Sequence, residues 1–479
     1  MFLRFKIKKR KMERQYTIAI FCVAASGHLN PLVSLANEMN KYKNCRIIFY
    51  GNMQHKKLIE SSKSEFRNLE VEDPAEKFNP NETRNELHID AMMGFMMLSF
   101  VMCAPEVRRL FEKVPFFLVI FDYFTGYIRM AVEKLKRLEK EGKLKKRLPK
   151  FATFCPSFMM DEKIFPNEAE KFFVPKPKIT LGFLVTLQIW MAKYLYFSWR
   201  HSLPLLNTKK MMFPEREALN LCCIIPEFQP RASLFPKSVK FIGSCASEEI
   251  RSVGNDFDEP LKSFMEPFKP INPLPLDDNF KIDKYKLASN TSTSIKLIYA
   301  SFGTAANRDP HQYIKVIESL KLLSSKDPIK SDEIRLLLSV GKESYAQMQQ
   351  MIEQKSLQMP SNVLMMERVP QLDVLKRASL FVTHCGQNSV SESMHYGVPM
   401  IGIPVMGDQL IVAYRMADEL GLGKSMGYDE ASPETIKQAI TDIMGDESYL
   451  ERTILYSKIS RKYNGIADGA KLMFDYLTN

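Results

Sequence analysis

The residues from 380 to 409 have the types and spacing to hold a phosphate group. The apolar run Leu380 to Thr383 is typical of a buried strand, and a small-residue turn leads from it into a predicted helix. The backbone N–H groups and the positive dipole at the start of such a helix attract an anion. Gly386 would let the backbone approach that anion closely, and His384 and Asn388 could donate hydrogen bonds to it. The sequence therefore predicts phosphate binding here.

The surroundings of this stretch predict the ligand-binding edge of a parallel sheet. Asn388 and Ser389 are good N-cap residues for the predicted helix. The next apolar run, Val398 to Ile403, predicts another buried strand, and Asp408 and Gln409 follow it in a loop. Because open parallel sheets bind ligands at the carboxyl ends of their strands, this loop lies where a ligand is expected.

A histidine and an aspartate near the start of the chain form a candidate catalytic pair. The run Thr17 to Ala24 predicts a central strand, and His28 follows it in a loop before a helix that Asn30 can cap. The run Phe116 to Phe121 predicts another strand, which Asp122 ends. Both side chains would lie at one sheet edge, although each alone is also explained by a capping role. The second glycine of a dinucleotide fingerprint is absent after the first strand, so NAD binding is not indicated.

Composition limits the class of protein. The chain has 479 residues, 45% apolar and 25% charged, which suits two or three folded domains rather than one core. The net charge of +12 is partly concentrated at 4–14 and 134–150. These basic runs could contact nucleic acid or an anionic membrane, but solvated faces and an N-terminal tail are the simpler interpretation. The eight cysteines contain no CxxC pair, so neither a zinc site nor a disulfide framework is indicated.

Two apolar stretches of the sequence are candidates for membrane-spanning helices. Ala91 to Ala104 is too short to cross a bilayer, and Ile179 to Trp199 is long enough but is interrupted by Gln188 and Lys193. We interpret both as helices of a ligand pocket, with a membrane span as the alternative for the second. Aromatic residues crowd 151–219, which suits a pocket for a bulky apolar ligand as well as core packing. The absence of a signal-type apolar run before the first strand favours the cytoplasm.

The stretch from 368 to 409 resembles the UDP-glycosyltransferase superfamily, and more narrowly its macrolide-glycosyltransferase-like branch. The resemblance extends from residue 16 to residue 475 and is weakest at 60–110, 150–215 and 250–290. It implies an α/β architecture, the GT-B fold, in which two Rossmann-like domains face each other across a cleft. The implied organisation is a basic tail at 1–15, an acceptor-binding domain at 16–246, a proline-rich linker at 247–294, a nucleotide-sugar-binding domain at 295–455, and terminal helices at 456–479 that pack back toward the first domain.

The resemblance assigns donor-binding roles residue by residue. Glu392 stands where the family binds the ribose, and Asp408 and Gln409 stand where it binds the sugar. Arg368 is a departure, because a tryptophan that stacks on the base is common there; a guanidinium can also stack, but the base preference is left open. The implied donor set is Ser301, Gly303 and Thr304 beneath the phosphates, Arg368, Val369 and Gln371 near the base, His384, Gly386, Asn388 and Ser389 on the diphosphate, and Glu392, Asp408 and Gln409.

The family resemblance also implies the reaction. It is an inverting, metal-independent transfer of a hexose from a UDP-sugar, UDP-glucose first among the candidates, to a hydroxyl of a hydrophobic lipid, sterol, macrolide or phenol. His28 would take the proton of the acceptor hydroxyl, and Asp122 would hold the imidazole. No cofactor beyond the donor and no nucleic acid would be needed. We expect a cytoplasmic monomer or weak dimer, with peripheral membrane contact left open.

Three other functions remain as alternatives. A nucleotide-sugar epimerase with the GT-B fold would not need the pair of His28 and Asp122. A non-catalytic nucleotide-sugar sensor would keep the fold, and Arg368 is the residue that leaves this function open. A nucleic-acid binder would need a base-stacking or groove-reading module beside the basic runs, and the sequence contains no such module.

Overall fold

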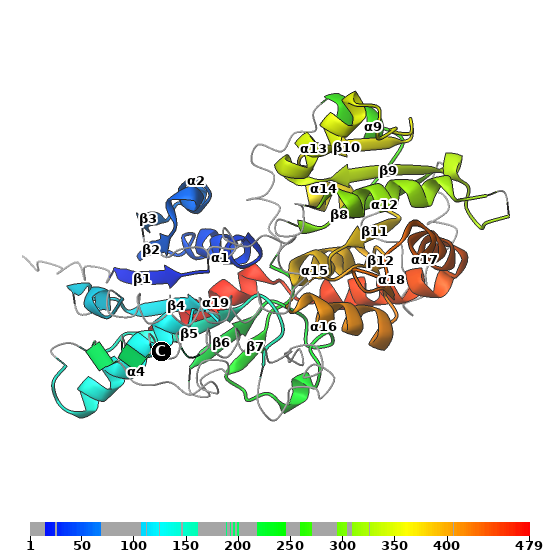
Figure 1. The fold of residues 1–479 in the computed structure, drawn as a ribbon. Coiled ribbons are helices and arrows are strands. Elements are labelled where there is room, and N and C mark those ends of the chain that lie inside the picture. Colours follow the sequence, from blue (N-terminus) through cyan, green and yellow to red (C-terminus); the bar gives the residue numbers. More distant parts are fainter. Residues whose placement is uncertain are drawn as a thin grey trace, which may run out of the picture.

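The computed structural model describes residues 15–23, 26–68, 107–111, 113–123, 125–144, 147–160, 218–245, 259–270, 295–303, 309–324, 326–405 and 407–479, and isolated positions between 188 and 200. The basic tail at 4–14, the apolar stretch at 91–104, Thr304, and most of the aromatic region and the linker lie outside these residues. The described residues form two parallel sheets, each with helices packed on it (Figure 1). The prediction of two Rossmann-like domains is confirmed.

The first sheet has seven parallel strands in the order β3-β2-β1-β4-β5-β6-β7. The central strands β1 and β4 are continuous apolar runs because helices cover both faces of the sheet. Its elements are β1 (Tyr16–Phe21), α1 (Ser26–Met39), β2 (Cys45–Gly51), a 3₁₀ turn (Met53–His55), α2 (Lys56–Ser61), β3 (Glu65–Asn68), β4 (Leu118–Asp122), α4 (Gly126–Lys140), β5 (Lys150–Cys155), β6 (Leu219–Cys222), a 3₁₀ turn (Ala232–Leu234) and β7 (Val239–Phe241).

The second sheet has six parallel strands in the order β10-β9-β8-β11-β12-β13, which repeats the winding of the first. The strand predicted at Leu380 to Thr383 matches β11. Its elements are β8 (Lys296–Ser301), α12 (Pro310–Lys321), a 3₁₀ turn (Ser331–Glu333), β9 (Ile334–Ser339), α13 (Gly341–Glu353), β10 (Val363–Met366), α14 (Gln371–Leu375), β11 (Leu380–Thr383), α15 (Gln387–Tyr396), β12 (Met400–Gly402), α16 (Gln409–Tyr414), a π-helical turn (Arg415–Glu419), β13 (Gly423–Ser425), α17 (Pro433–Gly445) and α18 (Glu447–Ser460).

The predicted linker contains a helix that the sequence analysis missed. Helix α9 (Glu259–Met265) buries Leu261 and Met265, and the adjacent Phe268 is also buried. Arg335 of β9 donates to the carbonyl oxygen of Phe264 at 2.6 Å, so this part of the linker is fastened to the second sheet. The prolines on both sides hid the helix, because they made the whole segment look like loop.

The last helix, α19 (Ile466–Thr478), returns to the first sheet. Ile466, Ala470 and Met473 belong to the same core as the apolar residues of α1 and β6. The return begins at Gly465, whose φ of +50° suits glycine, and a Cβ there would lie 2.0 Å from the carbonyl oxygen of Ser244. The chain can therefore cross this point only because residue 465 has no side chain.

The part of the chain that the structure describes contains no helix long and apolar enough to cross a membrane. Of the aromatic residues considered for a ligand pocket, Phe154 and Phe158 are buried in the protein core, whereas Tyr196 and Trp199 are 49% and 78% exposed. Phe158 stacks on Phe228 with ring centroids 5.4 Å apart. Core packing is therefore the correct interpretation of Phe154 and Phe158.

Candidate active site

His28 and Asp122 meet at the carboxyl edge of the first sheet. Asp122 is the last residue of β4 and is fully buried, and its Oδ2 lies 2.8 Å from Nδ1 of His28. The His28 side chain is 24% exposed. When Nδ1 donates its proton to the carboxylate, the lone pair of the imidazole lies on Nε2. The pair therefore has the arrangement of a general base and the group that orients it.

His28 lies on a helix rather than in a loop. Helix α1 begins by Ser26, so the prediction that Asn30 caps it is wrong. Pro31 lies inside the helix and has no N–H, so it cannot donate to the carbonyl oxygen of Gly27 four residues earlier. That oxygen instead accepts a hydrogen bond of 2.6 Å from Nδ2 of Asn388, in the second domain. The proline thus exposes a carbonyl group that joins the helix of His28 to α15.

Helix α15 begins at Gln387, with Gly386 in the N-cap position and without a side-chain cap. The prediction that Asn388 and Ser389 cap the helix is therefore wrong, because both lie within its first turn. Since Gly386 cannot cap with a side chain, the first N–H groups of the helix keep their capacity to bind an anion. The uncapped start agrees with the phosphate-binding role predicted for this stretch.

His384 is enclosed by two glycines. A Cβ on Gly303 would lie 2.5 Å from Cε1 of the imidazole, and a Cβ on Gly386 would lie 2.5 Å from Nε2. Burial lowers the pKa of His384 to about 4, and a hydrogen bond with the backbone of Ser301 opposes this shift. The ring is therefore neutral at pH 7 and carries no positive charge, and its single N–H can donate either to the backbone of Ser301 or to a phosphate, not to both. Thr304, predicted to join this turn, lies outside the described residues.

Glu392 is the buried carboxylate of the second domain. Its side chain lies on α15, and the residue is only 1% exposed. Nε2 of Gln371 donates to its Oε2 at 2.6 Å, and the hydroxyl of Tyr299 donates to Oε1 of Gln371 at 3.0 Å. Gln371 also lies 3.5 Å from Oγ of Ser389. The chain of hydrogen bonds fixes the carboxylate beside the start of α15.

Asp408 and Gln409 follow β12, as predicted, but Gln409 begins a helix instead of lying in a loop. Asp408 occupies the N-cap position of α16, and its Oδ2 accepts a hydrogen bond of 2.5 Å from Oγ of Ser157. Oε1 of Gln409 accepts from the backbone N–H of Val405 at 2.9 Å. The amide oxygen of Gln409 is therefore turned toward the backbone of the preceding loop.

Arg368 and Val369 lie between β10 and α14. Arg368 is exposed, and among the residues that the structure describes it forms no ion pair, with Glu367 or with any other acid. Val369 is partly buried against the core of the second domain. Stacking of Arg368 on a base stays a prediction.

The two halves of the site face each other. The contact of Asn388 with Gly27 places the start of α15 next to the first turn of α1, and Figure 1 shows α15 at the junction of the two domains. The contact of Ser157 with Asp408 joins the same sheet edges a second time. Sequence reasoning missed Ser157 and Tyr299, because a serine after a strand and a tyrosine inside one carry no recognisable pattern.

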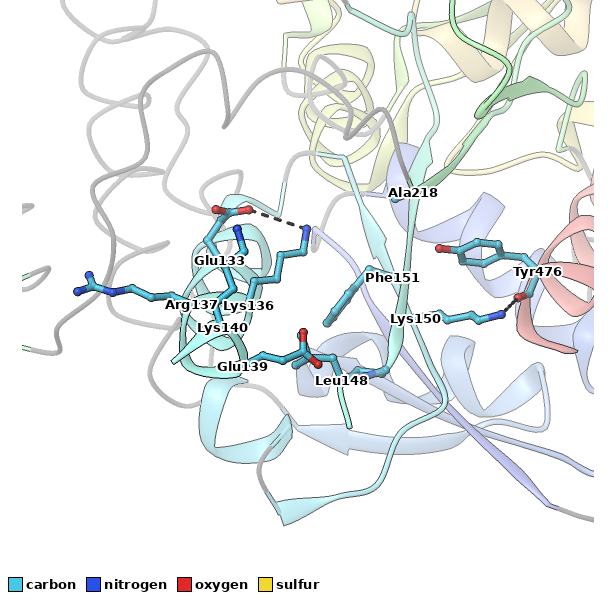
Figure 2. Close-up of a pocket in the computed structure, with 11 residues that line it drawn as sticks. Glu133, Lys136, Arg137, Glu139, Lys140, Leu148, Lys150, Phe151, Ala218 and Tyr476 are labelled. Atoms are coloured by element: carbon cyan, nitrogen blue, oxygen red, sulfur yellow. Dashed lines mark hydrogen bonds and ion pairs between the residues drawn. The ribbon is translucent and has the colours of Figure 1, made fainter. Parts of the chain in front are cut away.

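A cavity of about 730 Å³ lies elsewhere, against α4, the start of β5 and the end of α19 (Figure 2). Lys136 lies 3.9 Å from Glu133, and Nζ of Lys150 donates to the carbonyl oxygen of Tyr476 at 2.8 Å. Since Lys150 begins β5, this cavity is at the amino edge of the sheet, away from His28. Within the described ranges, no group of three histidine, cysteine, aspartate or glutamate residues could hold a metal ion.

Comparison with known proteins agrees with this geometry. The family model described as "UDP-glucoronosyl and UDP-glucosyl transferase" matches residues 343–463. NDP-glycosyltransferase YjiC of Bacillus licheniformis is 26% identical over 443 residues, which cover 91% of each chain. The solved glycotransferase of kitacinnamycin has a TM-score of 0.69 at 20% identity, covering 97% of this chain and 100% of its own. Medicago truncatula UGT71G1, solved with UDP-glucose, has a TM-score of 0.58 at 16% identity. The match covers 97% of this chain and 99% of UGT71G1. These structures are glycosyltransferases of the GT-B fold.

Proposed function

We propose that this chain, a nucleotide-sugar-dependent glycosyltransferase similar to the UDP-glycosyltransferase family, transfers a hexose from a UDP-sugar to a hydroxyl group of a hydrophobic small molecule. UDP-glucose is the first donor to test, since one of the similar structures was solved with it. The lipid, sterol, macrolide or phenol class of the acceptor is proposed from the aromatic and methionine-rich composition of the first domain.

The observation that carries the proposal is the pair of His28 and Asp122 beside the start of α15. Nε2 of His28 takes the proton of the acceptor hydroxyl while the hydroxyl oxygen attacks the anomeric carbon of the donor. The bond from that carbon to the diphosphate oxygen breaks, and UDP leaves with the electron pair. Attack from the face opposite the leaving group inverts the anomeric configuration. Asp122 stabilises the imidazolium that forms.

The donor is held by the second domain in this proposal. The first N–H groups of α15 and the neutral His384 bind the diphosphate, where they also stabilise the charge that develops as it leaves. Glu392, fixed by Gln371, accepts hydrogen bonds from the ribose. Asp408 and Gln409 contact the sugar. No metal is needed in this scheme, since backbone and side-chain donors supply the stabilisation.

A transfer screen tests the proposal. The protein is incubated with UDP-glucose, UDP-galactose, UDP-glucuronic acid or TDP-glucose and with a panel of hydrophobic alcohols and phenols. We expect release of UDP that depends on the acceptor, and a product whose anomeric configuration, measured by NMR, is opposite to that of the donor. Isomerisation of the donor without an acceptor would support the epimerase instead, and a product of retained configuration would overturn the role of His28.

Replacing Arg368 with Ala is expected to weaken UDP binding by about 1 kcal/mol, which is roughly fivefold, because a guanidinium stacked on a base contributes about this much. Calorimetry with UDP, TDP and GDP measures the loss for each base. The matched control is Arg368→Trp, which restores the flat group usual in the family and should keep or improve UDP binding. If the Ala variant binds all three nucleotides as the wild type does, Arg368 does not stack on the base.

A further inference from the structure

A serine of the first domain contacts the carboxylate proposed to bind the sugar. We infer that Ser157 is a positioning residue that orients Asp408 and thereby sets the selectivity of the enzyme for the donor sugar. The inference rests on the proposed role of Asp408 and adds a determinant of donor selectivity from the opposite domain. Ser157 lies two residues after β5 of the first sheet, and Asp408 lies between β12 and α16 of the second.

The contact itself is short and partly buried. Oγ of Ser157 donates to Oδ2 of Asp408 at 2.5 Å. Ser157 is only 5% exposed, so water competes poorly for this hydrogen bond. Removing the hydroxyl would leave one oxygen of the carboxylate without its partner.

The backbone of Ser157 is held in place independently of Asp408. Its carbonyl oxygen accepts from the buried thiols of Cys155, at 3.3 Å, and Cys222, at 3.2 Å. Burial raises the pKa of the Cys155 thiol, so this group stays protonated and can donate. Two residues further on, the N–H of Met159 donates to Oε1 of Gln229 at 2.9 Å. Because these contacts hold the backbone of Ser157 without help from Asp408, we expect the serine to orient the carboxylate of Asp408, and not the reverse.

The consequence for the sugar follows from the geometry of a carboxylate. With Oδ2 bound to Ser157, the plane of the group is fixed, and Oδ1 of Asp408 has no other hydrogen bond within the described part of the chain. Oδ1 is then an acceptor with one fixed direction. A site that directs a buried acceptor at one position accepts a sugar with a hydroxyl there and rejects an epimer without it. A carboxylate that can rotate would discriminate less.

The first test is Ser157→Ala, compared with Ser157→Thr, which keeps the hydroxyl. We expect the Ala variant to raise KM for UDP-glucose by about tenfold, in line with loss of a hydrogen bond to a charged group. The preference for UDP-glucose over UDP-galactose should shrink, while affinity for UDP, which lacks the transferred hexose, is unchanged. The Thr variant should keep the wild-type preference. If the Ala variant is too unstable to assay, Ser157→Cys has a similar volume and a much weaker donor, and the same loss is expected of it.

A double-mutant cycle with Asp408→Ala separates this inference from the proposed function. If Ser157 acts through Asp408, adding Ser157→Ala to Asp408→Ala changes KM and sugar preference no further. Additive effects, or an unchanged preference in Ser157→Ala alone, would overturn the inference while Asp408→Ala still impairs sugar use. If Asp408→Ala itself leaves UDP-glucose use unchanged, the assignment of Asp408 to the sugar fails, and the inference fails with it.

Discussion

Replacing His28 with Ala is expected to lower the turnover number for sugar transfer by about 10²–10⁴-fold, the usual effect of losing a positioned general base. The affinity for UDP should stay the same, because the proposed donor site is in the second domain and His28 belongs to the first. The structural reason for the large effect is the pairing of Nδ1 with the buried Asp122 at 2.8 Å, which fixes the tautomer and direction of the ring. Steady-state kinetics with saturating donor, together with calorimetry for UDP, measures both quantities.

The chain contains a matched control for this experiment. His311 also bonds an aspartate, Asp309, through Nδ1 at 2.9 Å, but its side chain is 76% exposed and lies at the start of α12. His311→Ala removes the same chemical group and should leave transfer near the wild-type rate. A turnover number near wild type in His28→Ala, or equal losses in the two variants, would remove the base mechanism.

Replacing Glu392 with Ala is expected to weaken UDP binding by about 1.5–3 kcal/mol, or roughly 10- to 100-fold, the range for a lost hydrogen bond to a charged group. Binding of the acceptor should be unchanged, because the acceptor site is proposed to lie in the first domain. Glu392 is buried, and Nε2 of Gln371 donates to its Oε2 at 2.6 Å. The loss of the carboxylate therefore leaves both the ribose and Gln371 without their hydrogen-bond partner. Calorimetry with UDP measures the loss.

A second ligand distinguishes ribose binding from a purely structural role of Glu392. The wild type should bind 2′,3′-dideoxy-UDP more weakly than UDP, because the carboxylate loses its hydroxyl partners. The Ala variant should bind the two ligands equally. If the substitution weakens both ligands by the same factor, Glu392 supports the shape of the site through Gln371 and does not contact the ribose.

The parts of the fold that the sequence predicts well are those set by local burial. Runs such as Leu380 to Thr383 are apolar throughout because a central parallel strand is covered on both faces, and β11 has these bounds. The same rule predicts that His28 and Asp122 lie close together, since strands β1 and β4 are neighbours, Asp122 ends β4, and His28 follows the carboxyl end of β1. The order of the strands in the sheet is therefore enough to predict that these two residues meet.

The errors have tertiary causes. The start of α1 is mispredicted because Pro31 is tolerated inside the helix, where Asn388 of the other domain supplies the donor that the proline lacks. The helix α9 is missed because its stability comes from burial against the second sheet and not from its own residues. The hydrogen bond of Ser157 with Asp408 joins residues from different sheets, and the sequence contains no signal for it.

The return of α19 to the first sheet has a consequence for engineering. Gly469 of α19 has no room for a side chain: a Cβ there would lie 2.9 Å from Ile242 and 3.5 Å from Leu221 and Leu35. The two lobes are therefore not consecutive modules, because the last thirteen-residue helix completes the core of the lobe that begins the chain. A chimera that takes its acceptor half from one relative and its donor half from another needs two crossovers, with residues 466–478 inherited from the parent that supplies α1 and β6. A single crossover near residue 250 would pair the core of the first lobe with a foreign α19.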